Sequence, residues 1–90
     1  MREFAVRFKA SALKELSRLP KAIQARVLDG VRLLAANPWS PLLPIRKMAG
    51  GGRRDLFRLR VGDYRVVYDV DRGTVVIHVI RVGHRKDVYR

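Results

Sequence analysis

The side chains of this chain that can do chemistry are mainly arginines. Lys and Arg together number 20 against 8 Asp and Glu, which leaves a net charge of +12 over 90 residues. Guanidinium groups bind phosphate through paired hydrogen bonds and keep their proton at neutral pH. Such an excess of positive charge is typical of a protein with a polyanionic partner, and a solvated charged surface is the alternative.

The basic residues are concentrated in two stretches of the sequence. One lies in the middle of the chain and the other in its last ten residues; together they comprise Arg46, Lys47, Arg53, Arg54, Arg58, Arg60 and Arg65, then Arg81, Arg85, Lys86 and Arg90. We expect a surface built from these side chains to bind RNA. For Arg53 and Arg54, which adjoin three glycines, solubilising the loop is an equally open alternative.

Proton transfer needs other side chains, because the pKa of arginine stays above about 12. Histidine titrates at about 6.5 when unperturbed, so His84 is a candidate proton carrier, with a surface residue that orients Arg85 as the alternative. His78 alternates with core valines and isoleucines, and a structural role is favoured for it. Core packing is the preferred interpretation for Tyr64 and Tyr68.

We expect chemistry that needs no metal and no cofactor. The chain has no cysteine, which excludes disulfides, thiol nucleophiles and zinc ribbons. His78 and His84 would stand about 20 Å apart along one strand, too far to share a metal. Gly50–Gly52 is not followed by the Gly-Lys-Ser/Thr of a phosphate-binding loop.

These residues must be positioned by a single small domain over residues 1–90. The periodicity predicts a strand over residues 3–8, a helix capped by Ser11 that ends before Pro20, and a second helix to about Ala36. A long irregular loop over residues 37–52 and three strands over 55–61, 64–70 and 74–82 follow. The result is an α+β fold, a helical hairpin packed on a small, mainly antiparallel four-stranded sheet in the order β-α-α-β-β-β.

No apolar run approaches the roughly 18 residues of a membrane span, so we expect a cytoplasmic protein with no membrane partner.

Period-2 alternation assigns the basic residues of the central strands to one face of this sheet. Phe57, Leu59 and Val61 form the core side of their strand, which turns Arg58 and Arg60 away from the helices. The next strand adds Arg65 to that open face. The tail from His84 to Arg90 then lies close enough to contribute, and we expect it to be mobile in the free protein.

Several motifs resemble the RelE/ParE superfamily of type II toxins, in the same order over nearly the whole chain. They are Ala-Leu-Lys-Glu-Leu at 12–16, Leu-Pro at 19–20, Asn-Pro at 37–38, Arg-Lys-Met-Ala-Gly at 46–50, Leu-Arg-Val-Gly-Asp-Tyr-Arg-Val-Val-Tyr at 59–68, Val-Ile-Arg-Val-Gly-His-Arg at 79–85 and Val-Tyr-Arg at 88–90. The ending, with an arginine soon followed by a tyrosine, is similar to the RelE branch. The resemblance implies a toxin that cleaves mRNA on the ribosome and is held silent by a cognate antitoxin, acidic and largely helical where bound. A ParE-like inhibitor of DNA gyrase is the alternative.

The resemblance also implies roles for individual residues. Arg65 and Arg85 match the family's phosphate-binding arginines, and Tyr89 matches a tyrosine that transfers a proton or stacks on a base. Arg58 matches a family lysine, and Leu56 stands where the best-known RelE toxin has another, so the general base remains open. The catalytic candidates are therefore Arg58, Arg65, His84, Arg85 and Tyr89, and the RNA-binding candidates are Lys47, Arg53, Arg54, Arg60, Arg81 and Lys86.

Overall fold

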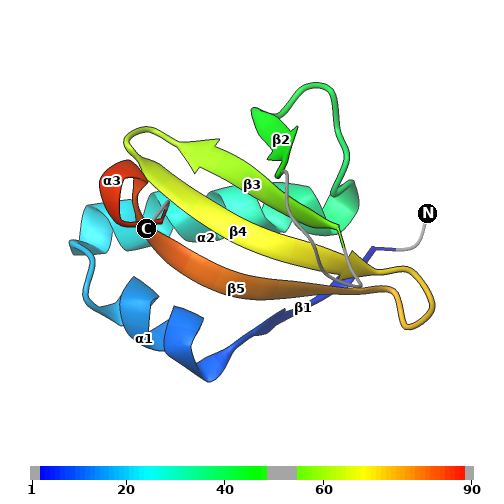
Figure 1. The fold of residues 1–90 in the computed structure, drawn as a ribbon, viewed down its shortest axis with the longest axis horizontal. Helices are drawn as coiled ribbons and strands as arrows, with labels where there is room; N and C mark the ends of the chain where they lie inside the picture. The colour runs from blue at the N-terminus through cyan, green and yellow to red at the C-terminus, as the bar shows by residue number, and fades with distance from the viewer. Residues whose placement is uncertain (1–2, 49–54, 89–90) are drawn as a thin grey trace.

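The computed structural model describes residues 3–48 and 55–88 and gives an α+β fold (Figure 1). Its elements are, in chain order, β1 (Ala5–Phe8), α1 (Ala10–Ser17), α2 (Lys21–Ala36), β2 (Ile45–Lys47), β3 (Leu56–Val61), β4 (Tyr64–Asp71), β5 (Val76–His84) and α3 (Arg85–Val88). The strands form one sheet in the order β1-β5-β4-β3-β2. The β1–β5 pair is parallel and the other neighbours are antiparallel.

The predicted fold class is confirmed, but the prediction of four strands is wrong. The fifth strand, β2, lies inside the stretch 37–52 that the prolines and glycines marked as irregular, and it pairs with β3. Ser11 is not a cap, because α1 begins at Ala10 after Lys9 and no side chain caps it. Strand β5 extends to His84, and residues 85–88 form the short helix α3, which the periodicity did not indicate.

The core lies between one face of the sheet and the two long helices. Figure 1 shows α2 crossing behind the sheet and α1 beyond β5, so neither of these two helices lies on the opposite face. The helices bury Ala12 and Leu16 of α1 and Val27, Val31 and Leu34 of α2. They pack against Leu59, Val66, Tyr68, Ile77, Val79 and Val82 of the sheet. We call the uncovered side of the sheet the open face.

A β-bulge in β5 brings these apolar residues to the core side. Tyr68 pairs with Val79 and Val67 pairs with Arg81, so Ile80 has no partner in β4. The extra residue shifts the alternation by one position. Val79 and Val82 can therefore both face the core, although three residues separate them.

Helix α1 closes the edge of β5 where β1 ends. Beyond Val79 the outer edge of β5 has no strand partner in β1. Glu15 of α1 takes that place, because its Oε1 accepts the Val82 N–H at 3.0 Å and its Oε2 lies 3.5 Å from Arg81 Nη2. One carboxylate thus satisfies a strand N–H and attaches the helix to the sheet.

Tyr68 connects the core to the segment that leads to β2. Its ring is fully buried and stacks on Phe57 with centroids 5.6 Å apart. Its hydroxyl donates a 2.7 Å hydrogen bond to the carbonyl of Pro38. The prediction of a core role is confirmed for Tyr68, whereas Tyr64 is half-buried at the end of the sheet, with its ring against His84.

Burial raises the pKa of the Tyr68 phenol well above its usual value of about 10. The folded state keeps the Tyr68 phenol neutral, whereas the unfolded chain ionises it above about pH 10. The contribution of Tyr68 to the free energy of unfolding is therefore complete below about pH 10 and decreases as the pH rises further. We expect Tyr68→Phe to lower the free energy of unfolding by about 1–3 kcal/mol at pH 7, since the Pro38 carbonyl loses its donor. Above pH 10 the difference should shrink. Urea unfolding of both proteins at several pH values measures this, and a constant difference would contradict the assignment.

Candidate nucleic-acid interface

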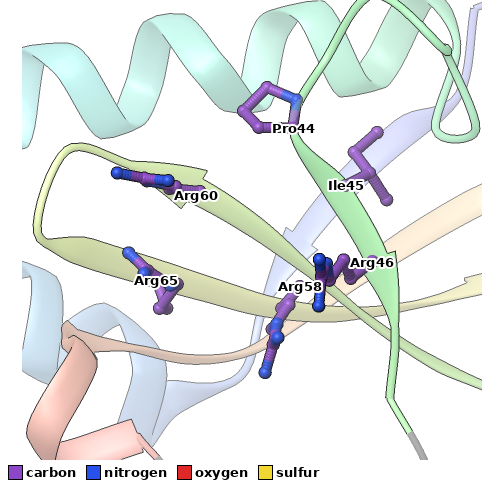
Figure 2. A pocket seen from close by; sticks show the side chains of 6 residues that line it. All are labelled: Pro44, Ile45, Arg46, Arg58, Arg60 and Arg65. Atoms are coloured by element: carbon purple, nitrogen blue, oxygen red, sulfur yellow. The ribbon is translucent and has the colours of Figure 1, made fainter.

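Four arginines line a pocket of about 290 Å³ on the open face, which we call the arginine pocket. They come from three neighbouring strands, with Arg46 on β2, Arg58 and Arg60 on β3, and Arg65 on β4 (Figure 2). Pro44 and Ile45 complete the lining, which contains no carboxylate within the described residues. The predicted placement of Arg58, Arg60 and Arg65 on one face of the sheet is consistent with this geometry.

The strand register sets these arginines directly opposite one another. Arg60 pairs with Arg65 across the β3–β4 ladder, and Arg46 pairs with Arg58 across the β2–β3 ladder. Side chains directly opposite in an antiparallel pair have Cβ atoms about 4.5–5.5 Å apart, and like charges there are destabilising. Two such pairs concentrate four positive charges in one small pocket.

Hydrogen bonds to the backbone fix one of the four guanidinium groups. Arg65 Nη1 donates to the carbonyls of Gly62 and Tyr64, both at 3.0 Å. Gly62 occupies the β3–β4 turn with a φ of 59°, in the left-handed region that favours glycine. The turn therefore presents carbonyls that hold Arg65 in place, and its planar head keeps further donors for a ligand.

The end of β5 brings Arg85 to the same turn. The Arg85 N–H, at the start of α3, donates a 2.8 Å hydrogen bond to the carbonyl of Asp63. Arg85 directly follows His84, which pairs with Tyr64 of β4, and the Arg85 side chain is exposed. The structure brings two of the predicted phosphate-binding residues, Arg65 and Arg85, to the same end of the sheet.

His84 lies apart from the arginine pocket. Its ring meets Tyr64 edge-on, with centroids 5.6 Å apart, and lines a different hollow with Glu15 and Leu19. Tyr64 alternates with Arg65 and so belongs to the helix side of the sheet. His84 Nδ1 accepts the Lys86 N–H at 3.2 Å, which places His84 where it orders the first residues of α3.

The remaining predicted residues are divided between other surfaces. Lys47 lies 3.3 Å from Asp55, and Arg81 lies 3.5 Å from Glu15, so each of these cations has an acidic neighbour. Lys86 is exposed in α3. The predictions for Arg53, Arg54 and Tyr89 fall outside the described residues.

Arg46 is the pocket residue that the sequence placed in the basic stretch but that was not among the named catalytic or RNA-binding candidates. It belongs to the basic stretch, but the strand that orients it has only three residues, Ile45–Lys47, between prolines and glycines. The alternation Ile-Arg-Lys after Pro44 was the available signal. It is too short to distinguish a strand from a loop.

The described residues offer no alternative site of a common kind. No group of three or more His, Asp or Glu residues within 3–48 and 55–88 is placed to hold a metal ion. Over the same ranges, none of the helices has the length and apolar character needed to cross a membrane.

Comparison with known proteins identifies the family. A family model described as the ParE toxin of type II toxin-antitoxin systems, parDE, matches residues 6–89. Toxin RelG of Mycobacterium tuberculosis is 33% identical over 88 residues, which cover 97% of each chain. Toxin RelE of the same organism is 35% identical over 97% of this chain and 87% of its own length.

A solved structure has the same fold. The toxin in the crystal structure of the archaeal RelE-RelB complex from Pyrococcus horikoshii superimposes with a TM-score of 0.79 at 32% identity, over 94% of this chain and 98% of that chain. The resemblance to the RelE/ParE superfamily is confirmed. With a family model that spans most of its length and relatives that match it from end to end, the chain belongs to the ParE toxin family of type II toxin-antitoxin systems.

Proposed function

We propose that this toxin is a ribosome-dependent endoribonuclease that cleaves mRNA and thereby stops translation. The observation that carries the proposal is the arginine pocket, in which two cross-strand arginine pairs from three neighbouring strands line one small hollow. Such a site fits a phosphate that gains negative charge as it reacts. Because the substrate would be mRNA under translation, the proposal also places the protein in the cytoplasm.

The reaction proposed for this site needs no cofactor. The ribose 2′-oxygen attacks the adjacent phosphorus and loses its proton to a base, while the bond from phosphorus to the 5′-oxygen breaks. A proton returned to that 5′-oxygen completes the reaction, which leaves a 2′,3′-cyclic phosphate and a 5′-hydroxyl. The guanidinium groups stabilise the extra charge on the phosphoryl oxygens between these two proton transfers.

Within this proposal, the residues have different tasks. Arg65 and Arg85 bind the reacting phosphate from the β3–β4 turn and from α3, and Arg46, Arg58 and Arg60 supply positive charge from the adjoining strands. Arginine is unsuited to be the base. We assign proton transfer to Tyr89, following the family motif. We assign to His84 the positioning of the first residues of α3, which include Arg85.

We expect Arg65→Ala and Arg85→Ala each to reduce cleavage by about 100-fold or more and to abolish growth arrest, because each removes a charge-assisted contact to the transition state. Primer extension on a translated message measures the loss. Arg32→Ala is the matched control, since Arg32 is an exposed arginine of α2 paired with Asp29, and its removal changes the net charge equally. Full cleavage by an Arg65 or Arg85 variant at equal soluble expression would remove that residue from the site.

A second pair of variants tests the role of Tyr89. If its hydroxyl transfers a proton, Tyr89→Phe should slow single-turnover cleavage by about 100-fold. A nearly silent Tyr89→Phe together with a costly Tyr89→Ala would instead assign base stacking to the ring.

The same assays separate this function from the inhibition of DNA gyrase. A gyrase inhibitor needs an exposed binding surface and no cluster of cations around one phosphate. We expect purified toxin to leave the supercoiling activity of gyrase unchanged while it cuts translated messages. Inhibited supercoiling with intact messages would reverse the assignment.

We further propose that a cognate antitoxin rich in Asp and Glu covers the open face and excludes RNA. The P. horikoshii relative was solved as a RelE-RelB complex, which supports a protein partner. Binding of an acidic partner to a chain of charge +12 should weaken as salt screens both surfaces. Calorimetric titration at low and high ionic strength measures this, and an affinity independent of salt would indicate a mainly apolar interface.

A further inference from the structure

A second hollow lies on the open face, on the other side of β4 from the arginine pocket. It has a volume of about 380 Å³ and is lined by Arg7, Phe8, Lys9, Asp69, His78 and Ile80. The register brings three of these residues side by side, because His78 of β5 pairs with Arg7 of β1 and with Asp69 of β4. We call this the His78 hollow.

A hydrogen bond to Asp69 orients the imidazole ring at the centre of this hollow. His78 Nδ1 lies 2.9 Å from Asp69 Oδ1. Asp69 is the only buried charged residue within the described ranges, with 9% exposure, and it is on the sheet face that no helix covers. Burying a carboxylate is costly unless it is paired, and His78 provides such a pairing for Asp69. The contact agrees with the structural role predicted for His78, and 35% of the His78 side chain remains exposed in the hollow.

The lining suits an unpaired nucleobase better than a phosphate alone. Bases in single-stranded RNA stack on histidine and phenylalanine rings and on the plane of an arginine guanidinium. His78 supplies the ring and Arg7 the guanidinium, while Ile80 adds apolar surface. Lys9 adds a cation for the neighbouring phosphate. A site for inorganic phosphate would not need the aromatic and apolar lining.

The two sites are within reach of one strand of RNA. Arg65 and Asp69 lie on the same face of β4, four residues apart, which corresponds to roughly 13 Å along the strand. Val67, between them, is buried on this face, and no helix intervenes. A single strand can therefore lie across the open face with a phosphate at the arginine pocket and a base in the His78 hollow.

We propose that the His78 hollow is a base-binding subsite for the RNA strand whose phosphate occupies the arginine pocket. This subsite rests on the proposed ribonuclease function and adds to it a part of the site that contacts bases. The arginines bind the backbone of any sequence, whereas a base-binding hollow makes cleavage depend on which nucleotide it receives.

The two histidines of the chain allow a direct test by NMR on the full-length protein. The probes are a short single-stranded RNA of A and U and an abasic ribose-phosphate chain of the same length. We expect the RNA to shift the ring signals of His78 and the abasic chain to leave them in place, while both ligands shift the guanidinium signals of Arg65. The His84 ring, which contacts the start of α3, reports separately on the end of the sheet where Arg85 lies. Equal responses of His78 to both ligands, or a response of Arg65 alone, would overturn the subsite. No response from either residue would overturn both the subsite and RNA binding by this face.

A matched pair of variants tests the ring itself. Because removing His78 alone would also break its hydrogen bond to the buried Asp69 carboxylate, both variants carry Asp69→Asn. One adds His78→Phe, which keeps an aromatic ring, and the other adds His78→Ala. The Ala variant should bind the RNA roughly 5- to 150-fold more weakly than the Phe variant, the range expected for one lost base stack. It should also redistribute cleavage sites among codons.

The outcomes distinguish this inference from the ribonuclease proposal. Equal affinity and equal cleavage patterns in the two variants would overturn the subsite and leave the ribonuclease intact. Weaker RNA binding by the Ala variant in a toxin that cuts no message would retain the base-binding hollow and overturn the ribonuclease. Thermal unfolding of both variants establishes that each is folded before the comparison.

Discussion

The repulsion between arginines held directly opposite each other is the constraint on which this structure depends. Arg60 against Arg65 and Arg46 against Arg58 oppose closure of the β2–β3–β4 ladders. The other face of the same strands supplies the opposing free energy, because Leu59, Val66 and Tyr68 are buried there against α2 and its neighbours. The two faces of the sheet therefore differ: the helix side stabilises the fold, and the open face carries positive charge that a bound anion would neutralise.

A few polar contacts hold the edges of this two-sided sheet. Glu15 substitutes for a missing strand along β5, and the Tyr68 hydroxyl ties the segment before β2 to the core. Both contacts lie between segments far apart in the sequence. The Tyr68 contact helps to place β2, and with it Arg46, against β3, although β2 is too short to be stable on its own.

The sequence predicted the elements with a long, regular pattern and missed those set by tertiary contacts. Alternation over β3 and β4 was sufficient to assign Arg58, Arg60 and Arg65 to one face, since one strand face had to be apolar. It could not predict β2, whose three residues form a strand only because β3 is beside them, nor the unpaired Ile80 that shifts the alternation in β5. It could not predict the Asp69–His78 pair either. That pair depends on the register between two strands, which neither strand specifies alone.

The position of β5 between β1 and β4 has a consequence for synthesis of the toxin. The sheet places residues 5–8 of β1 beside residues 76–79 of β5, so β1 cannot pair until β5 has been synthesised. Contacts of such large sequence separation form late in folding. While the chain is still emerging from the ribosome, its two helices have no sheet to cover, and β1 has no neighbour. The parallel pair therefore delays completion of the sheet until β5 has been synthesised.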